Sequence, residues 1–242
     1  MNGLPSAFHA FNAQHIITLG VISIAGILVV WVARKGTSLQ RKGLRLFLAF
    51  LLLGYAACVY IPQGIRHALT WQYSLPLELC NLILIACIIA LFRPIRIITE
   101  IAYFLGGGGV LQATLTPDLG QGFPSWDFIL FFWGHGVTLL AIIFFISGRE
   151  FKPGKGSIVR VMIALNVYAL IVGTINAIMG WNYGYLCQKP SRPSLFDLMG
   201  PWPWYLLSTE VIALVIFLIL DLPWRVLALS KRRGPPNYRT RS

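Results

Sequence analysis

Seven long apolar stretches, separated by short polar segments, dominate the chain. They cover about residues 15–33, 44–61, 76–92, 97–116, 127–147, 158–179 and 203–222. A helix needs roughly 20 mostly apolar residues to cross the hydrocarbon core of a bilayer, and each stretch is close to that length. Because the connections are short, the pattern predicts an all-α integral membrane protein. We expect a seven-transmembrane-helix bundle that forms a single domain over residues 1–242.

The composition agrees with this pattern. Hydrophobic residues make up 57% of the chain and charged residues only 12%, whereas soluble domains carry about 25% charged residues. The N-terminal segment MNGLPSAFHAFNAQ has no basic residue before its apolar stretch. It therefore lacks the charged start of a cleavable signal peptide, and we expect the first helix to be retained.

The basic residues are distributed unevenly among the connections. If the N-terminus lies outside, only Arg66, Lys189 and Arg192 of the 20 Lys and Arg residues fall on the outer side. The positive-inside rule therefore predicts an outside N-terminus and an inside C-terminus. The basic tail at 230–242 is predicted to contact anionic inner-leaflet lipid rather than nucleic acid. The expected location is the cell membrane, the cytoplasmic membrane of a bacterium, with the oligomeric state left open.

Polar residues inside the predicted helices gather toward one side of the membrane. Polar groups in a bilayer are costly, and they are usually paired or functional. Along the expected helix directions, those of the third to sixth helices converge in the outer half of the bilayer, which predicts a cavity there. The residues concerned are Glu78, Cys80, Asn81, Gln112, His135, Asn176, Asn182 and Tyr183.

Small residues accompany these polar groups. Gly106–Gly109 are four consecutive glycines in the fourth helix. Close packing of helices is the favoured explanation, because small residues let backbones approach, and local unwinding beside a cavity is the alternative. Gly134 and Gly136 flank His135, and their lack of side chains is expected to leave the imidazole ring reachable.

Cys80 and His135 are the candidate catalytic residues. An imidazole can take the proton of a thiol, and the thiolate can then carry an acyl group as a thioester. Each residue also has a structural explanation, since a membrane Cys is commonly a small buried hydrophobe and a His can bond across helices. Cys87 is the competing thiol, on one helical face with Cys80 but deeper in the membrane.

The other polar residues have supporting roles in this prediction. Glu78 is expected to anchor helices or contact substrate, because Cys80 points to a different side of the helix. Asn81 and Asn182 are candidates for polarising an acyl carbonyl or holding a head group. The four cysteines form no CxxC pair and no cluster with metal-site spacing, so we predict neither a metal nor a cofactor.

Five segments, in order, resemble a known family. PLELCN, GGGGVLQATLTPDLG, FFWGHG, NAIMGWNYGYLCQKP and LMGPWPWY, within about residues 70 to 210, are similar to the YwaF-type integral membrane proteins, relatives of eukaryotic transmembrane protein 164. The resemblance implies a Cys–His acyltransferase of membrane phospholipids, whose essential Cys and His match Cys80 and His135. The ether-lipid substrate of the eukaryotic relatives is not carried over. Many members have His where this chain has Glu78.

Two other functions fit parts of the sequence. Glycine-interrupted helices with polar groups also suit a transporter or channel for a small solute. Against this, the halves of the chain show no repeat, and the polar residues crowd one side. Seven helices and an outside N-terminus would suit a receptor. The last helix contains no Lys, which excludes a retinal Schiff base there.

Overall fold

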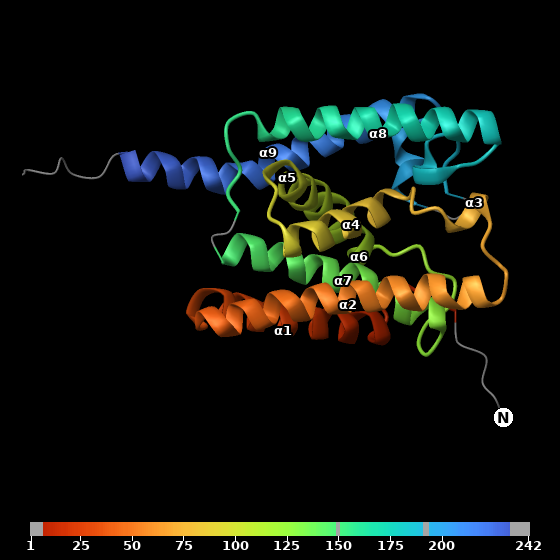
Figure 1. Ribbon diagram of the computed structural model, residues 1–242. Coiled ribbons are helices and arrows are strands. Elements are labelled where there is room, and N and C mark those ends of the chain that lie inside the picture. The colour runs from red at the N-terminus through yellow and green to blue at the C-terminus, as the bar shows by residue number, and fades with distance from the viewer. Residues whose placement is uncertain (1–6, 149–150, 191–193, 233–242) are drawn as a thin grey trace, which may run out of the picture.

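A computed structural model describes residues 7–148, 151–190 and 194–232 of the chain. These residues are mostly helical and contain no β-strand, apart from one isolated bridge between Ala7 and Gln121 (Figure 1). The helices are α1 Ala13–Lys35, α2 Ser38–Ile65, α3 Trp71–Ser74, α4 Leu79–Phe92, α5 Arg96–Leu105, α6 Leu111–Leu115, α7 Trp126–Ser147, α8 Ser157–Met179 and α9 Trp204–Arg232, with a π-helical segment at Gly106–Val110 and short 3₁₀ turns at Tyr183–Tyr185 and Leu195–Met199.

Five of the described helices are long and apolar enough to cross a membrane: α1, α2, α7, α8 and α9. The other two predicted stretches take different forms. The third becomes α4, which is apolar but only 14 residues long. The fourth becomes α5, the π-helical segment and α6, which follow one another without a break. The structure is therefore that of a multi-pass membrane protein with at least five candidate spans.

Three predicted helices have other bounds in the structure. The second extends from Ser38 to Ile65 instead of about 44–61. The third helix begins at Leu79, not at residue 76, because Glu78 is its N-cap and has an extended backbone. Proline disfavours helical geometry in the residue before it, and Leu75, which precedes Pro76, is also extended. The last helix runs on to Arg232 and contains Pro223, instead of ending at 222. The predicted basic tail lies mostly beyond Arg232, outside the described residues.

The helices form three layers (Figure 1). α1, α2 and α7 contact one another on one side, and α8 and α9 pair on the other. Between them lie α4 and the run α5–π–α6, which contacts both layers. Helix α7 is the most buried of the candidate spans. Of its 18-residue apolar segment, 56% is buried inside the protein, against 17% or less for the other four candidate spans. Their exposed apolar side chains are the surface that lipid would cover.

Three of the four consecutive glycines allow the middle layer to pack closely. A Cβ on Gly106 would lie 2.4 Å from Ile142 of α7 and 3.1 Å from Ile83 of α4. On the other side, a Cβ on Gly107 would lie 3.1 Å from Leu220 of α9. The helix is widened to π geometry here but is not unwound. Close packing, the favoured explanation of these glycines, agrees with these contacts.

A buried carboxylate joins the middle layer to α8. The side chain of Glu100 is fully buried and accepts two hydrogen bonds from Arg160, at 2.6 and 2.8 Å. Ser157 and Arg96 donate to the same carboxylate at 2.7 and 3.0 Å. Because a buried charge is tolerated only when it is paired and hydrogen-bonded, this network fixes the start of α5 against the start of α8.

The glycine contacts predict unequal effects within one turn of the π segment. Gly106→Ala forces a methyl group against two buried isoleucines and should lower the free energy of unfolding by about 1–3 kcal/mol. Gly109→Ala is the matched control, because its Cβ would meet nothing within 4 Å. Thermal melting of both purified variants in detergent measures the difference. Equal melting temperatures for the two variants would contradict close packing at Gly106.

Candidate functional site

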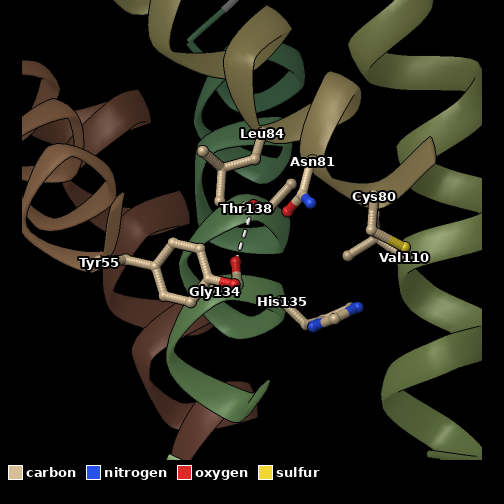
Figure 2. Close-up of a pocket in the computed structure, with 8 residues that line it drawn as sticks. All are labelled: Tyr55, Cys80, Asn81, Leu84, Val110, Gly134, His135 and Thr138. Carbon is tan, nitrogen blue, oxygen red and sulfur yellow. Dashed lines mark hydrogen bonds between the residues drawn. The ribbon is translucent and has the colours of Figure 1, made fainter. Parts of the chain in front are cut away.

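A small cavity lies where α2, α4, the π segment and α7 meet (Figure 2). Its volume is about 10 Å³, which is about the space that a single water molecule needs. Eight residues line it: Tyr55, Cys80, Asn81, Leu84, Val110, Gly134, His135 and Thr138. The lining thus brings a thiol, an amide, an imidazole and two hydroxyl groups together among apolar walls.

Cys80 enters this cavity from the first turn of α4. It is the second residue of the helix and is followed directly by Asn81, which also lines the cavity. Cys87 lies two turns further along α4, where it is fully buried in the hydrophobic core and is not part of the lining. Of these two thiols, the structure therefore brings only Cys80 to the cavity with His135.

His135 is held by its own helix. Its Nδ1 atom lies 2.9 Å from the carbonyl oxygen of Phe131, one turn earlier in α7. The His135 and Phe131 rings are also stacked, with centroids 4.0 Å apart and an interplanar angle of 18°. A carbonyl oxygen can only accept, so the Nδ1 atom carries the proton of the neutral ring. The lone pair is then on Nε2, the nitrogen that acts as a base in this tautomer.

The two glycines beside His135 make room for neighbouring helices. A Cβ on Gly134 would lie 2.9 Å from the ring of Tyr55, and a Cβ on Gly136 would lie 3.2 Å from Ile22 of α1. They were expected to leave the imidazole reachable, and in the structure they also allow close contact of α7 with α2 and α1. Gly134 thereby brings Tyr55 into the cavity wall.

Four lining residues were not predicted from the sequence: Tyr55, Leu84, Val110 and Thr138. Thr138 donates a hydrogen bond of 2.7 Å to the carbonyl oxygen of Gly134, a contact within one helix that predicts no site. Tyr55 is one of several aromatic residues in a helix whose pattern is that of an ordinary membrane span. Only its contact with Gly134 singles it out, and this contact depends on how α2 packs on α7.

Glu78 lies just before α4 and holds a loop. Its Oε2 atom accepts a hydrogen bond of 3.0 Å from the backbone N–H of Gly184, in the segment after α8. Next to it, Tyr168 of α8 donates to the carbonyl oxygen of Leu77 at 2.9 Å. Glu78 is not part of the cavity lining. It joins two distant segments of the chain, and the two contacts position the start of α4.

Asn176 and Tyr183 form a clamp after α8. The side chain of Asn176 donates to the carbonyl oxygen of Tyr183 at 2.8 Å and accepts from its N–H at 3.0 Å, and both residues are buried. The hydroxyl of Tyr183 reaches the carbonyl oxygen of Trp71 at 3.2 Å. Buried backbone groups need such partners where no regular helix supplies them. Neither residue lines the cavity.

Asn182 and Gln112 also lie elsewhere. The side-chain carbonyl oxygen of Asn182 accepts from the N–H groups of Cys187 and Gln188, and its amide donates to the carbonyl oxygen of Gln188. Gln112 donates to Thr116 at 2.7 Å on the exposed side of α6. Of the eight predicted site residues, the cavity thus contains Cys80, Asn81 and His135, and the other five stabilise nearby loops and helix ends or lie on the surface.

The fold and the cavity define a multi-pass α-helical membrane protein with a thiol and an imidazole in one small cavity. The chain belongs to the TMEM164 family, whose family model matches residues 10–221. No curated protein and no solved structure matches the chain. Among the described residues, no group of three His, Cys, Asp or Glu side chains could hold a metal ion.

The clamp between Asn176 and Tyr183 predicts a local effect on the loop. Asn176→Ala leaves the buried N–H of Tyr183 without the side-chain oxygen that accepts from it, so the Tyr183 amide should exchange with solvent at least about tenfold faster. Hydrogen–deuterium exchange of the purified protein measures this rate. Thr174→Ala is the control, because Thr174 is exposed and its hydroxyl bonds only to Leu170 in its own helix. Unchanged exchange in Asn176→Ala would show that the clamp does not hold the loop.

Proposed function

We propose that the protein is a Cys–His acyltransferase that moves fatty acyl chains between membrane lipids through a thioester on Cys80. One observation carries the proposal: Cys80 of α4 and His135 of α7, far apart in the sequence, line the same small cavity. The resemblance of the sequence segments to transmembrane protein 164 supports the same assignment, because its essential Cys and His match these two positions.

The first half of the reaction loads the enzyme. The Nε2 atom of His135 takes the thiol proton of Cys80, and the sulfur attacks the ester carbonyl carbon of a phospholipid. A carbon–sulfur bond forms, and the ester carbon–oxygen bond breaks. The departing lipid alkoxide takes the proton back from His135 and leaves as a lysolipid hydroxyl, with the acyl group held as a thioester.

The second half transfers the acyl group. A hydroxyl of the acceptor lipid gives its proton to His135, and its oxygen attacks the thioester carbonyl. The new ester bond forms as the carbon–sulfur bond breaks, and the proton on His135 returns to the thiolate of Cys80. No oxidant, metal or nucleotide takes part. A site with room for about one water favours transfer to an alcohol over hydrolysis.

Asn81 is the residue proposed to polarise the acyl carbonyl. It lines the cavity directly beside Cys80, whereas the other candidate, Asn182, is fully engaged in its own loop. An amide N–H aimed at a developing oxyanion is a common source of transition-state stabilisation. The cavity is too small for an acyl chain, so the chain would lie along the lipid-facing side of the helices, and only the carbonyl would enter.

We also propose seven spans with the N-terminus outside and the C-terminus inside. The seven spans are the five long helices, the shorter helix α4, and the continuous run α5–π–α6. The excess of Lys and Arg on the connections assigned to the inside supports this orientation. The cavity then lies toward the outer surface, because Cys80 is in the first turn of an inward-running helix.

Reporter fusions test the topology. Alkaline phosphatase, which is active only outside the cytoplasm, should be active when fused after residue 122 and inactive when fused after Arg232. A green fluorescent protein fused at the same two positions should give the reverse pattern, because it fluoresces only when folded inside. Phosphatase activity at Arg232 would contradict the odd number of spans or the orientation.

Acylation of Cys80 tests the chemistry. Membranes that contain the wild-type protein should yield a hydroxylamine-labile acyl group on the Cys80 peptide, detected by mass spectrometry. Cys80→Ala should remove the group and abolish transfer between labelled phospholipids. His135→Ala should slow transfer by about 10²–10⁴-fold, the usual contribution of a general base. Asn81→Ala should slow it less, with the thioester still forming.

Cys87→Ala is the matched control for a thiol on the same helix. It should keep acylation and transfer at the wild-type level, because Cys87 lies in the core outside the cavity. A labile acyl group on Cys87, or unchanged lipids in both the Cys80 and His135 variants, would overturn the proposal. Solute flux through the protein that persists in Cys80→Ala would favour the transporter instead.

A further inference from the structure

Two cavities lie at opposite ends of α4, and they differ in the groups that line them. The larger, of about 370 Å³, lies between the start of α2 and the end of α4, and the described residues that line it include neither a thiol nor an imidazole. The smaller, at the start of α4, holds Cys80 and His135 together with the amide of Asn81 and the hydroxyl groups of Tyr55 and Thr138. Of the two, it alone combines a nucleophile with a base.

The hydrogen-bond donors around the smaller cavity are not all available to a substrate. The Nδ1–H of His135 is engaged with a carbonyl oxygen of its own helix at 2.9 Å. Thr138 donates to the carbonyl oxygen of Gly134 at 2.7 Å. Within the part of the chain that the structure describes, the hydroxyl of Tyr55 and the side-chain amide of Asn81 have no hydrogen-bond partner. These two groups are therefore the side-chain donors that can bind a ligand there.

The ring of Tyr55 is held in place although its hydroxyl is unpaired. The ring lies against the backbone of α7, because a Cβ on Gly134 would come within 2.9 Å of its Cε2 and Cζ atoms. Trp133 packs edge-on against it, with ring centroids 6.5 Å apart, and is itself bonded through its indole N–H to the carbonyl oxygen of Leu51 at 3.0 Å. Cζ carries the hydroxyl, so the hydroxyl lies at the turn of α7 that also carries His135 (Figure 2).

The chemistry at this cavity creates a charge that such donors can stabilise. When the sulfur of Cys80 adds to an ester carbonyl carbon, the electron pair of the C=O bond moves to the oxygen, and it returns when the ester oxygen leaves. Preorganised donors aimed at that oxygen lower the energy of the transition state, and they are commonly used in sets. Asn81 supplies one donor from α4. A second donor from a different helix would fix the position of the oxygen.

We propose that Tyr55 donates the second hydrogen bond to the oxyanion of the acyl-transfer reaction. Asn81 and Tyr55 then bind the same oxygen, while Cys80 is bonded to the carbon. The phenol donates a hydrogen bond and keeps its proton, because His135 carries the proton that moves between the sulfur and the alcohol. This inference rests on the proposed function, and it gives a catalytic residue to α2, a helix whose sequence is that of an ordinary membrane span.

Tyr60 is the matched control in the same helix. It is half-buried like Tyr55, and its hydroxyl has no hydrogen-bond partner among the described residues, but it does not line the cavity. Replacing either tyrosine by phenylalanine removes one oxygen atom and keeps the ring. The contacts of the Tyr55 ring with Gly134 and Trp133 are therefore preserved in Tyr55→Phe.

Transfer of a labelled acyl chain between phospholipids, in membranes that contain the full-length protein, tests the role of this hydroxyl. Tyr55→Phe should lower kcat by about 10²–10³-fold, the usual cost of losing one oxyanion donor, and leave KM nearly unchanged, because the bond is made in the transition state. Tyr60→Phe should keep the wild-type rate. Equal rates in the two variants would overturn the role of Tyr55, whereas Cys80→Ala shows separately whether the transfer depends on the thiol.

Binding of a fatty aldehyde tests the same hydrogen bond without turnover. The thiol of Cys80 adds to the carbonyl group of hexadecanal. A carbon–sulfur bond forms, and the thiol proton passes through His135 to the carbonyl oxygen, which takes the place of the oxyanion. The hexadecanal concentration that halves iodoacetamide labelling of the Cys80 peptide measures this binding. It should be at least about tenfold lower than that of hexadecanol, which has no carbonyl, and Tyr55→Phe should raise it about 3–10-fold.

The two measurements distinguish failure of this inference from failure of acyl transfer. An unchanged hexadecanal concentration in Tyr55→Phe overturns the inference even if acyl chains are transferred. Protection of Cys80 by hexadecanol as strong as that by hexadecanal also overturns it, because the site then has no donor for an oxyanion. If the wild type transfers no acyl chain but hexadecanal protects Cys80 in a Tyr55-dependent way, acyl transfer is wrong and the hydrogen bond from Tyr55 is supported.

Discussion

Close packing of neighbouring helices against Gly106, Gly107 and Gly108 is the constraint on which the rest of the bundle depends. Here the middle layer touches α4, α7 and α9 at nearly one depth, with Ile83 and Ile142 in the places that side chains at Gly106 would need. In lipid, helices gain no hydrophobic attraction to one another, so close packing and polar contacts must hold them together. The same approach brings Val110 of the π segment to the cavity that contains Cys80 and His135.

The two cavities have different chemical characters because they lie at opposite ends of α4. At its first turn, a thiol, an amide and an imidazole share a space of about one water molecule, which suits covalent chemistry sheltered from solvent. At its last turn, three cationic and three apolar side chains line a much larger space. A 14-residue helix thus separates the two cavities.

The sequence predicted the class of fold but not the form of every helix. The length of the apolar stretch was sufficient to predict the bounds of α1, α7 and α8 to within two residues. It failed at α4, because Leu75 and Glu78 on either side of Pro76 are extended and the helix starts only at Leu79. It also failed at α9, which continues through Pro223. Hydropathy reports which residues avoid water, whereas the first residue of a helix depends on local backbone geometry.

By itself, the sequence determined that this is a helical membrane protein and that Cys80, Asn81 and His135 are polar groups in costly surroundings. Only the tertiary structure decided which groups share a cavity. It added Tyr55 and Thr138 and left Glu78, Asn176 and Asn182 to hold loops. The physical reason is that helical spacing specifies the face on which a side chain lies. Its neighbours depend on how closely other helices approach that face, and here the glycines of α7 and the π segment set that distance.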